Sequence, residues 1–215
     1  MKEYILKICG LTDRKQAEET AQAGATHIGM IFFEKSPRHV PLEVIREISA
    51  GIKGRAISVA VTVNQDLKTL QNLLDVVDMV QLHGEEPVGL IRDLPEGRVI
   101  KALRIKDEKD LEKVELYGKT GVPVLIDAYS EKAYGGTGKQ IEPQLAKKAV
   151  DIYPMTVLSG GLSPENVGQL LEQIRPAGVD ASSKLEVRPG VKDMTRVKKF
   201  IDTVRDFYES DNKAD

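Results

Sequence analysis

Short runs of apolar, β-branched residues alternate with amphipathic segments along the whole of the 215-residue chain. Runs without a polar face, such as Val122-Pro-Val-Leu-Ile126, are typical of strands in a parallel sheet that helices cover on both sides. The amphipathic segments have the periodicity of helices that bury one face. The pattern predicts eight strands, at residues 4–8, 27–33, 55–63, 78–82, 99–103, 122–126, 156–158 and 178–181.

A helix is predicted behind each strand, at residues 13–23, 42–50, 67–74, 88–93, 109–116, 143–150, 164–174 and 193–208. We expect Thr12 or Asp13 to cap the first helix and Gly24 to end it. Repeated strand–helix units form parallel βαβ structure, and eight units close into a (β/α)8 TIM barrel. A doubly wound open sheet is the alternative, but it rarely needs eight strands at this length. We therefore predict an α/β protein with one barrel domain, residues 1–208, and a charged, frayed tail, residues 209–215.

Composition narrows the class of protein without naming a function. Hydrophobic residues make up 41% of the chain, and 31 basic residues nearly balance 33 acidic ones, which leaves a net charge of −2. This balance argues against a nucleic-acid coat or a membrane-surface protein. No apolar run approaches the roughly 20 residues that span a bilayer, and no secretory signal is evident at the N-terminus. The single cysteine fits a reducing compartment, so we expect a cytoplasmic protein. The composition is compatible with a monomer and with a homodimer.

Polar residues gather where the predicted strands end, whereas the strand entrances show nothing comparable. In barrels of this kind the active site lies at the carboxyl ends of the strands. The residues that follow the eight strands in order are Cys9, Lys35-Ser-Pro-Arg38, Asn64, His83-Gly-Glu85, Arg104, Asp127, Ser159-Gly-Gly161 and Ser182-Ser183.

The loops after the last two strands have the features of a phosphate site. Gly160 and Gly161 let backbone N–H groups approach an anion, and Ser182 or Ser183 can cap a following turn whose N-terminus attracts negative charge. Phosphate sites in barrels often use these two loops. The alternative is that the glycines only make tight turns and that Ser182 is an ordinary helix cap.

Cys9 and Asp127 are the residues best placed for acid–base chemistry. Burial at the end of an apolar strand raises the pKa of an aspartate, as a general acid near neutral pH requires. On the first and sixth strands of a barrel, the two side chains face each other across its mouth. Lys7 shares a strand face with Cys9, and its ammonium would favour the thiolate. Each residue also has a structural alternative. Cys9 could be a small buried thiol, Asp127 could cap a loop, and Lys7 could fill the barrel interior as a polar plug.

Other signals are weaker. Arg38 could grip a carboxylate with two parallel hydrogen bonds, although a solvated surface arginine is the simpler reading. His83 could take part in catalysis, but a histidine at such a position more often packs within a loop. Gly135-Gly-Thr-Gly138 lacks the context of a P-loop and is read as a lid. No pair of His or Cys residues has metal-ligand spacing, which excludes a structural zinc and argues against a catalytic one.

Taken in order, these segments resemble the phosphoribosylanthranilate isomerases, (β/α)8 enzymes of tryptophan biosynthesis. The matching segments are Lys7-Ile-Cys-Gly10, Lys35-Ser-Pro-Arg-His39, Gln81-Leu-His-Gly84, Leu125-Ile-Asp-Ala128, Gly135-Gly-Thr-Gly138, Ser159-Gly-Gly-Leu-Ser-Pro-Glu-Asn166, Gly178-Val-Asp-Ala-Ser-Ser183 and Pro189-Gly-Val-Lys-Asp193. The resemblance implies an Amadori rearrangement of a phosphoribosyl anthranilate, a small phosphosugar. Only protons move in that reaction, so the resemblance also implies that no metal or redox cofactor is needed. It implies Cys9 as general base, Asp127 as general acid and Arg38 on the anthranilate carboxylate. Lys7, His83 and Asp180 are expected to contact substrate, and Gly160, Gly161, Ser182 and Ser183 to bind its phosphate.

Two departures and three rival readings remain. The family commonly has Phe-Asp-Trp shortly after the glycine-rich segment, where this chain reads Lys139-Gln-Ile-Glu-Pro143. Glycine usually follows the paired serines, where Lys184 stands here. The rivals are another phosphosugar isomerase, such as the ProFAR isomerase of histidine biosynthesis, a Schiff-base aldolase that uses Lys101, and a phosphoribosyl-ligand binder without turnover.

Overall fold

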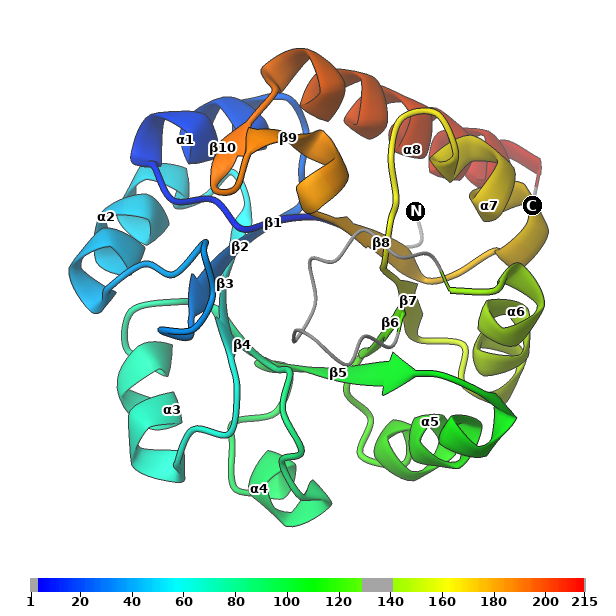
Figure 1. Ribbon diagram of the computed structural model, residues 1–215, viewed down its shortest axis with the longest axis horizontal. Coiled ribbons are helices and arrows are strands. Elements are labelled where there is room, and N and C mark those ends of the chain that lie inside the picture. The colour runs from blue at the N-terminus through cyan, green and yellow to red at the C-terminus, as the bar shows by residue number, and fades with distance from the viewer. Residues whose placement is uncertain (1–3, 129–140, 215) are drawn as a thin grey trace.

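The computed structural model describes residues 4–128 and 141–214. Within this part of the chain, eight parallel strands close into a barrel in the order β1 to β8, as Figure 1 shows. The barrel confirms the predicted fold and excludes the open doubly wound sheet. The strands are β1 (Ile5–Cys9), β2 (His27–Phe32), β3 (Ile57–Thr62), β4 (Met79–Leu82), β5 (Val99–Ile105), β6 (Val124–Ala128), β7 (Thr156–Leu158) and β8 (Gly178–Ala181).

Helices surround the barrel (Figure 1). Their apolar faces pack on its outer surface. In α7, for example, Val167, Leu170, Leu171 and Ile174 are buried at the spacing of one helical face. The helices are α1 (Arg14–Gln22), α2 (Leu42–Ile52), α3 (Leu67–Leu74), α4 (Val88–Arg92), α5 (Leu111–Gly118), α6 (Pro143–Ile152), α7 (Val167–Ile174) and α8 (Met194–Ala214), with a short 3-10 helix η1 (Glu108–Asp110) before α5. No helix in the described residues is long and apolar enough to cross a membrane.

Local sequence signals explain some of the helix ends. Asp13, one of the two predicted caps, accepts a hydrogen bond from the backbone N–H of Gln16 at the start of α1. The last helix differs from the expectation, because α8 continues past residue 208 to Ala214. Residues 209–214, expected as a frayed tail, are therefore the final turns of this helix.

A small apolar layer fills the inside of the barrel. Its members are Val59, Met79, Ile100, Ala102, Leu125 and Val157, which project inward from β3 to β7. Lys7 and Lys101 are also fully buried. Because packed side chains occupy the interior, a ligand has room only at the mouth, where the strands end.

The loop after β8 contains structure that the hydrophobic pattern did not predict. A 3-10 helix, η2 (Ser183–Leu185), leads into a two-stranded antiparallel sheet of β9 (Glu186–Arg188) and β10 (Val191–Lys192). Lys192 Nζ donates to the carbonyl oxygen of Cys9, at 2.6 Å, which holds this small sheet against the end of β1.

Candidate active site

A cavity of about 310 Å³ lies at the carboxyl ends of the strands. All the predicted site residues except Lys7 line it: Cys9, Arg38, His83, Asp127, Gly160, Gly161, Asp180, Ser182 and Ser183. Apolar side chains from β2, β3 and the loops that follow these strands complete the wall, among them Ile31, Val61 and Val63. The cavity is therefore polar at its base and at one end and apolar along one side. Such a lining suits a ligand that combines a charged group with a ring.

Cys9 ends β1 beside a buried ion pair. Lys7 Nζ lies 3.0 Å from Asp180 Oδ1, and both side chains are shielded from solvent. Burial raises the pKa of the Cys9 thiol, while the Lys7 and Lys192 ammonium groups oppose this effect. The expectation that Lys7 favours the thiolate is therefore right in sign, but burial is the larger influence. Lys7 lies beneath the cavity, behind Cys9 and Asp180.

Space for the thiol comes from a glycine on the neighbouring strand. A Cβ atom on Gly29 would lie 2.8 Å from Cys9 Sγ and 2.9 Å from Lys7 Nζ. No side chain larger than hydrogen fits at this position unless the thiol and the ammonium move. Gly29 is therefore part of the site, although a glycine inside an apolar strand gives no chemical signal in the sequence.

Asp127 lies inside β6, one residue before its end, and is almost fully buried. Burial, reinforced by the charge of Asp180, raises the pKa of Asp127 to about 7. Its Oδ2 lies 3.8 Å from Nε2 of His83, whose pKa burial and the charge of Lys101 lower to about 3. Near neutral pH the site thus holds an uncharged imidazole beside a carboxyl group that can still carry a proton.

Arg38 is held in a fixed position. The whole residue is only 8% exposed, which excludes the solvated surface arginine considered from sequence. Its Nε and Nη2 atoms donate to the carboxylate of Glu186 at 2.7–3.1 Å. Nothing in the sequence points to Glu186, because the short strand that carries it has no distinctive pattern.

Three buried polar atoms that face this cavity have no hydrogen-bond partner among the described residues. They are Gln81 Oε1, His83 Nε2 and Ser182 Oγ, and all three residues line the cavity. A buried polar atom without a partner costs on the order of 1–3 kcal/mol, so the arrangement indicates a polar ligand. Gln81 begins one of the segments that match the family, but nothing in the sequence predicts a role for its side chain. Ser182 does not cap η2 through its hydroxyl, contrary to one of the readings from sequence.

The end of the cavity near β7 and β8 is built from backbone. Gly160 and Gly161 have φ of 89° and 65°, a left-handed conformation that side chains rarely adopt. This conformation lets the chain turn sharply above the barrel with its backbone exposed to the cavity. Ser183 begins η2 at the same end. Together these loops can supply N–H donors to an anion.

Lys101 does not reach the cavity. It is 1% exposed, and Nζ donates to Glu86 Oε2 at 2.7 Å and to two backbone carbonyls. A lysine that forms a Schiff base must reach the ligand, so this geometry argues against the aldolase reading. The described residues contain no group of three His, Cys, Asp or Glu that could hold a metal ion. Gly135–Gly138 and the departure that begins at Lys139 lie outside the described residues, apart from residues 141–143.

Comparison with known proteins gives a consistent result. The family profile described as "PRAI: N-(5'phosphoribosyl)anthranilate (PRA) isomerase" matches residues 6–203. The N-(5'-phosphoribosyl)anthranilate isomerase of Sulfurihydrogenibium sp. (strain YO3AOP1) is 48% identical over 94% of this chain and 98% of its own length.

Solved structures give the same family. The phosphoribosyl anthranilate isomerase of Thermotoga maritima superposes with a TM-score of 0.87 at 34% identity, covering 95% of this chain and all of that chain. A phosphoribosyl anthranilate isomerase in complex with reduced 1-(o-carboxyphenylamino)-1-deoxyribulose 5-phosphate gives a TM-score of 0.84 at 33% identity, with the same coverage.

Proposed function

The chain belongs to the N-(5'-phosphoribosyl)anthranilate isomerase family, and we propose that Cys9 is the general base and Asp127 the general acid of its reaction. The reaction converts N-(5'-phosphoribosyl)anthranilate to 1-(2-carboxyphenylamino)-1-deoxyribulose 5-phosphate, a step of tryptophan biosynthesis. One observation carries the assignment: a thiol and a carboxyl group with a pKa near 7 line the same cavity.

The first step opens the ribose ring. Asp127 in its protonated form donates to the ring oxygen as the bond from this oxygen to C1 breaks. The electron pair on the anilino nitrogen then forms a C=N bond, which gives a protonated Schiff base. A pKa of about 7 suits this role, because the carboxyl group still carries a proton near neutral pH and releases it readily.

The second step moves the double bond. The Cys9 thiolate removes the proton from C2, the C–H electron pair forms a C1=C2 bond, and the C=N pair returns to nitrogen. The resulting enolamine loses its hydroxyl proton and gains a proton at C1, which gives the ketone. Lys7 and Lys192 stabilise the thiolate form against the cost of burial. Protons pass between the substrate and the side chains, and electron pairs shift only within the substrate. The two side chains are therefore sufficient for the acid–base steps.

Binding at both ends of the substrate holds the sugar between these two groups. The phosphate is assigned to Gly160, Gly161, Ser182 and Ser183, and the anthranilate carboxylate to Arg38. Asp180 and His83 are assigned to the sugar, since both line the cavity between its ends, and Lys7 acts from below through Asp180. Binding energy from the phosphate can hold the reacting carbons in a productive geometry.

The reaction can be tested with the purified chain and N-(5'-phosphoribosyl)anthranilate. Anthranilate-type fluorescence should fall faster than spontaneous hydrolysis allows, and the product should carry the ketone at C2. Binding without turnover would instead indicate a phosphoribosyl-ligand binder. Turnover of ProFAR but not of this substrate would indicate the other phosphosugar isomerase.

The described residues of this one chain bring both the thiol and the carboxyl group of the proposed reaction to the cavity, which is compatible with a monomer and with a homodimer. A Thermotoga maritima relative is described as dimeric, and we propose one of these two states for this protein. Sedimentation velocity distinguishes them. We also propose a cytoplasmic location, since the one cysteine is a free thiol in the site.

A further inference from the structure

We propose that Glu186 is a positioning residue that orients Arg38 toward the carboxylate of the substrate ring and so sets the preference for an acidic aromatic ligand. The proposal rests on the proposed function, which gives Arg38 its ligand. Glu186 does not line the cavity, so it acts through Arg38.

The contact between the two side chains is bidentate. Arg38 Nε lies 2.8 Å from Glu186 Oε1 and 3.1 Å from Oε2, and Arg38 Nη2 lies 2.7 Å from Oε2. Such paired charge-assisted bonds fix the plane of a guanidinium group as well as its position. Both side chains are largely buried, at 9% and 3% exposure, so water competes little for these bonds.

This geometry leaves one edge of the guanidinium available. Glu186 occupies the edge formed by Nε and Nη2, which uses two of the five N–H groups. The edge formed by Nη1 and the second N–H of Nη2 has no other partner that the structure shows among its described residues. A second carboxylate can bind that edge through two parallel bonds, and Arg38 lines the cavity.

Lys192 balances the charge of Glu186. Its Nζ lies 2.9 Å from Glu186 Oε1 and also donates to the carbonyl oxygens of Cys9 and Ser182. The two cations and one carboxylate leave a net charge of +1 beside the cavity, so a ligand carboxylate is attracted rather than repelled. The same ammonium connects the backbone of the base to the backbone of the phosphate loop.

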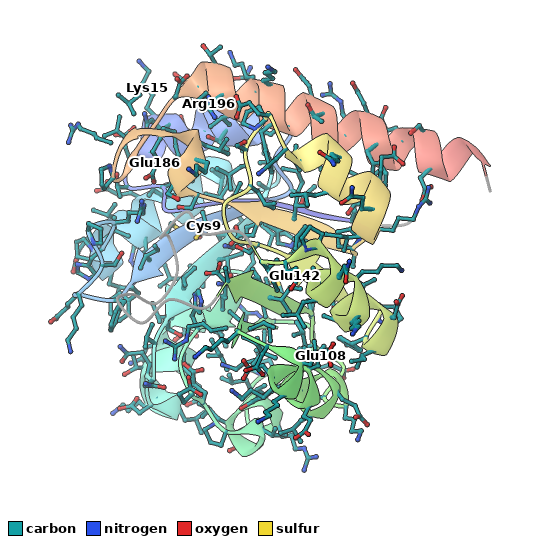
Figure 2. All side chains as sticks on the ribbon, turned by 45° about the vertical axis from the view of Figure 1, so that its right-hand side comes forward. Cys9, Lys15, Glu108, Glu142, Glu186 and Arg196 are labelled. Carbon is teal, nitrogen blue, oxygen red and sulfur yellow. The ribbon has the colours of Figure 1, made fainter. Side chains whose placement is uncertain are left out.

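The arginine is also held from its other side. A Cβ atom on Gly10 would lie 2.7 Å from Arg38 Cδ, so the arginine stem packs directly on the backbone after Cys9. Figure 2 labels Cys9, at the end of β1, and Glu186, in the short strand β9 that follows β8 and η2. Buried ion pairs are weak grounds for stability in themselves. The network of Arg38, Glu186 and Lys192 connects the base, the carboxylate site and the phosphate loop. Its role is therefore better explained as holding these parts in position around the ligand.

The test compares two ligands by calorimetry. One is reduced 1-(o-carboxyphenylamino)-1-deoxyribulose 5-phosphate, and the other is the same compound without the ring carboxyl group. The Kd of the compound without the carboxyl group, divided by the Kd of the carboxylated compound, measures recognition of the carboxylate alone. We expect Glu186→Gln to lower this ratio by about tenfold, since the bidentate bond is lost. Glu186→Asp keeps the charge, so its Kd ratio should lie between those of the wild type and Glu186→Gln. This variant replaces Glu186→Gln in the test if the glutamine variant does not fold.

A double-variant comparison separates positioning from a general structural effect. Arg38→Met should bring the ratio close to one, and adding Glu186→Gln to it should change the ratio no further. Glu165→Gln, which breaks the exposed pair with Arg196, is the matched control and should leave the ratio unchanged. An unchanged or higher ratio in Glu186→Gln, or an effect that persists without Arg38, would overturn the proposal. Failure of the wild-type protein to isomerise its substrate would instead overturn the proposed function.

Discussion

Cys9 and Asp127 experience the same dominant influence, which is burial, and it moves both pKa values upward. For Asp127 the result is a carboxyl group that titrates near pH 7. For Cys9 it is a thiol that ionises above its ordinary value of about 8.5. The acid thus loses its proton at a lower pH than the base does, so the reactive pair of a thiolate and a protonated carboxyl is a minor form at every pH.

This order of ionisation predicts an unusual pH dependence. Between the two pKa values, the rising thiolate fraction cancels the falling fraction of protonated Asp127, so kcat/KM should be level from about pH 7 to the thiol pKa. It should fall in more acidic solution, where the thiolate is lost, and in more alkaline solution, where the proton on Asp127 is lost. In Asp127→Asn the residual rate should instead rise about tenfold per pH unit across the level range. A variant that kept the level profile would show that Asp127 is not the titrating acid.

Gly29 offers a second test at the residue scale. In Gly29→Ala the new Cβ atom would overlap Cys9 Sγ, at 2.8 Å, so the thiol must move away from its position. We expect kcat to fall at least about tenfold and the protein to lose roughly 1–3 kcal/mol of stability from overpacking. Gly89→Ala is the matched control, because nothing lies within 4 Å of its Cβ position in α4. Equal activity in the two variants would contradict the account of the thiol pocket.

Among the elements, the loop between β4 and α4 is held at the barrel mouth by a buried ion pair between Lys101 and Glu86. The carboxylate of Glu86 accepts from the backbone N–H groups of Asn64 and Gly84 and from Lys101 Nζ. Lys101 also donates to the carbonyl oxygens of Leu82 and Gly84, on either side of His83. The pair therefore fixes the turn that presents His83 to the cavity.

Breaking this pair should destabilise the protein measurably. Lys101→Met leaves the Glu86 charge buried without its cation, so the free energy of unfolding should fall by roughly 3–5 kcal/mol. Lys119→Met, which removes an exposed pair with Glu115, should cost less than about 1 kcal/mol. Urea denaturation of the two variants measures the difference. Equal losses would mean that the buried pair does not stabilise the β4–α4 loop.

For the whole molecule, the hydrophobic pattern was sufficient to predict the barrel and the positions of its strands. Once the barrel is known, the residues at strand ends must meet at one mouth, which is why Cys9 and Asp127 could be paired despite their separation in sequence. The roles of Glu186 and Lys192 could not be predicted in this way, because β9 and β10 are too short to show an alternation of apolar and polar residues. Gly29 escaped prediction because its role is the absence of a side chain, which only the neighbouring strand makes visible.

The central claim concerns two side chains, and the most direct measurement is the single-turnover isomerisation rate of Cys9→Ala and Asp127→Asn. Each rate should fall by roughly 10²–10⁴-fold, while the Kd of reduced 1-(o-carboxyphenylamino)-1-deoxyribulose 5-phosphate changes by no more than about threefold. Asp151→Asn, at an exposed position on α6, should match the wild-type rate. A near wild-type rate in either site variant, with the ligand still bound, would contradict the assignment of base or acid.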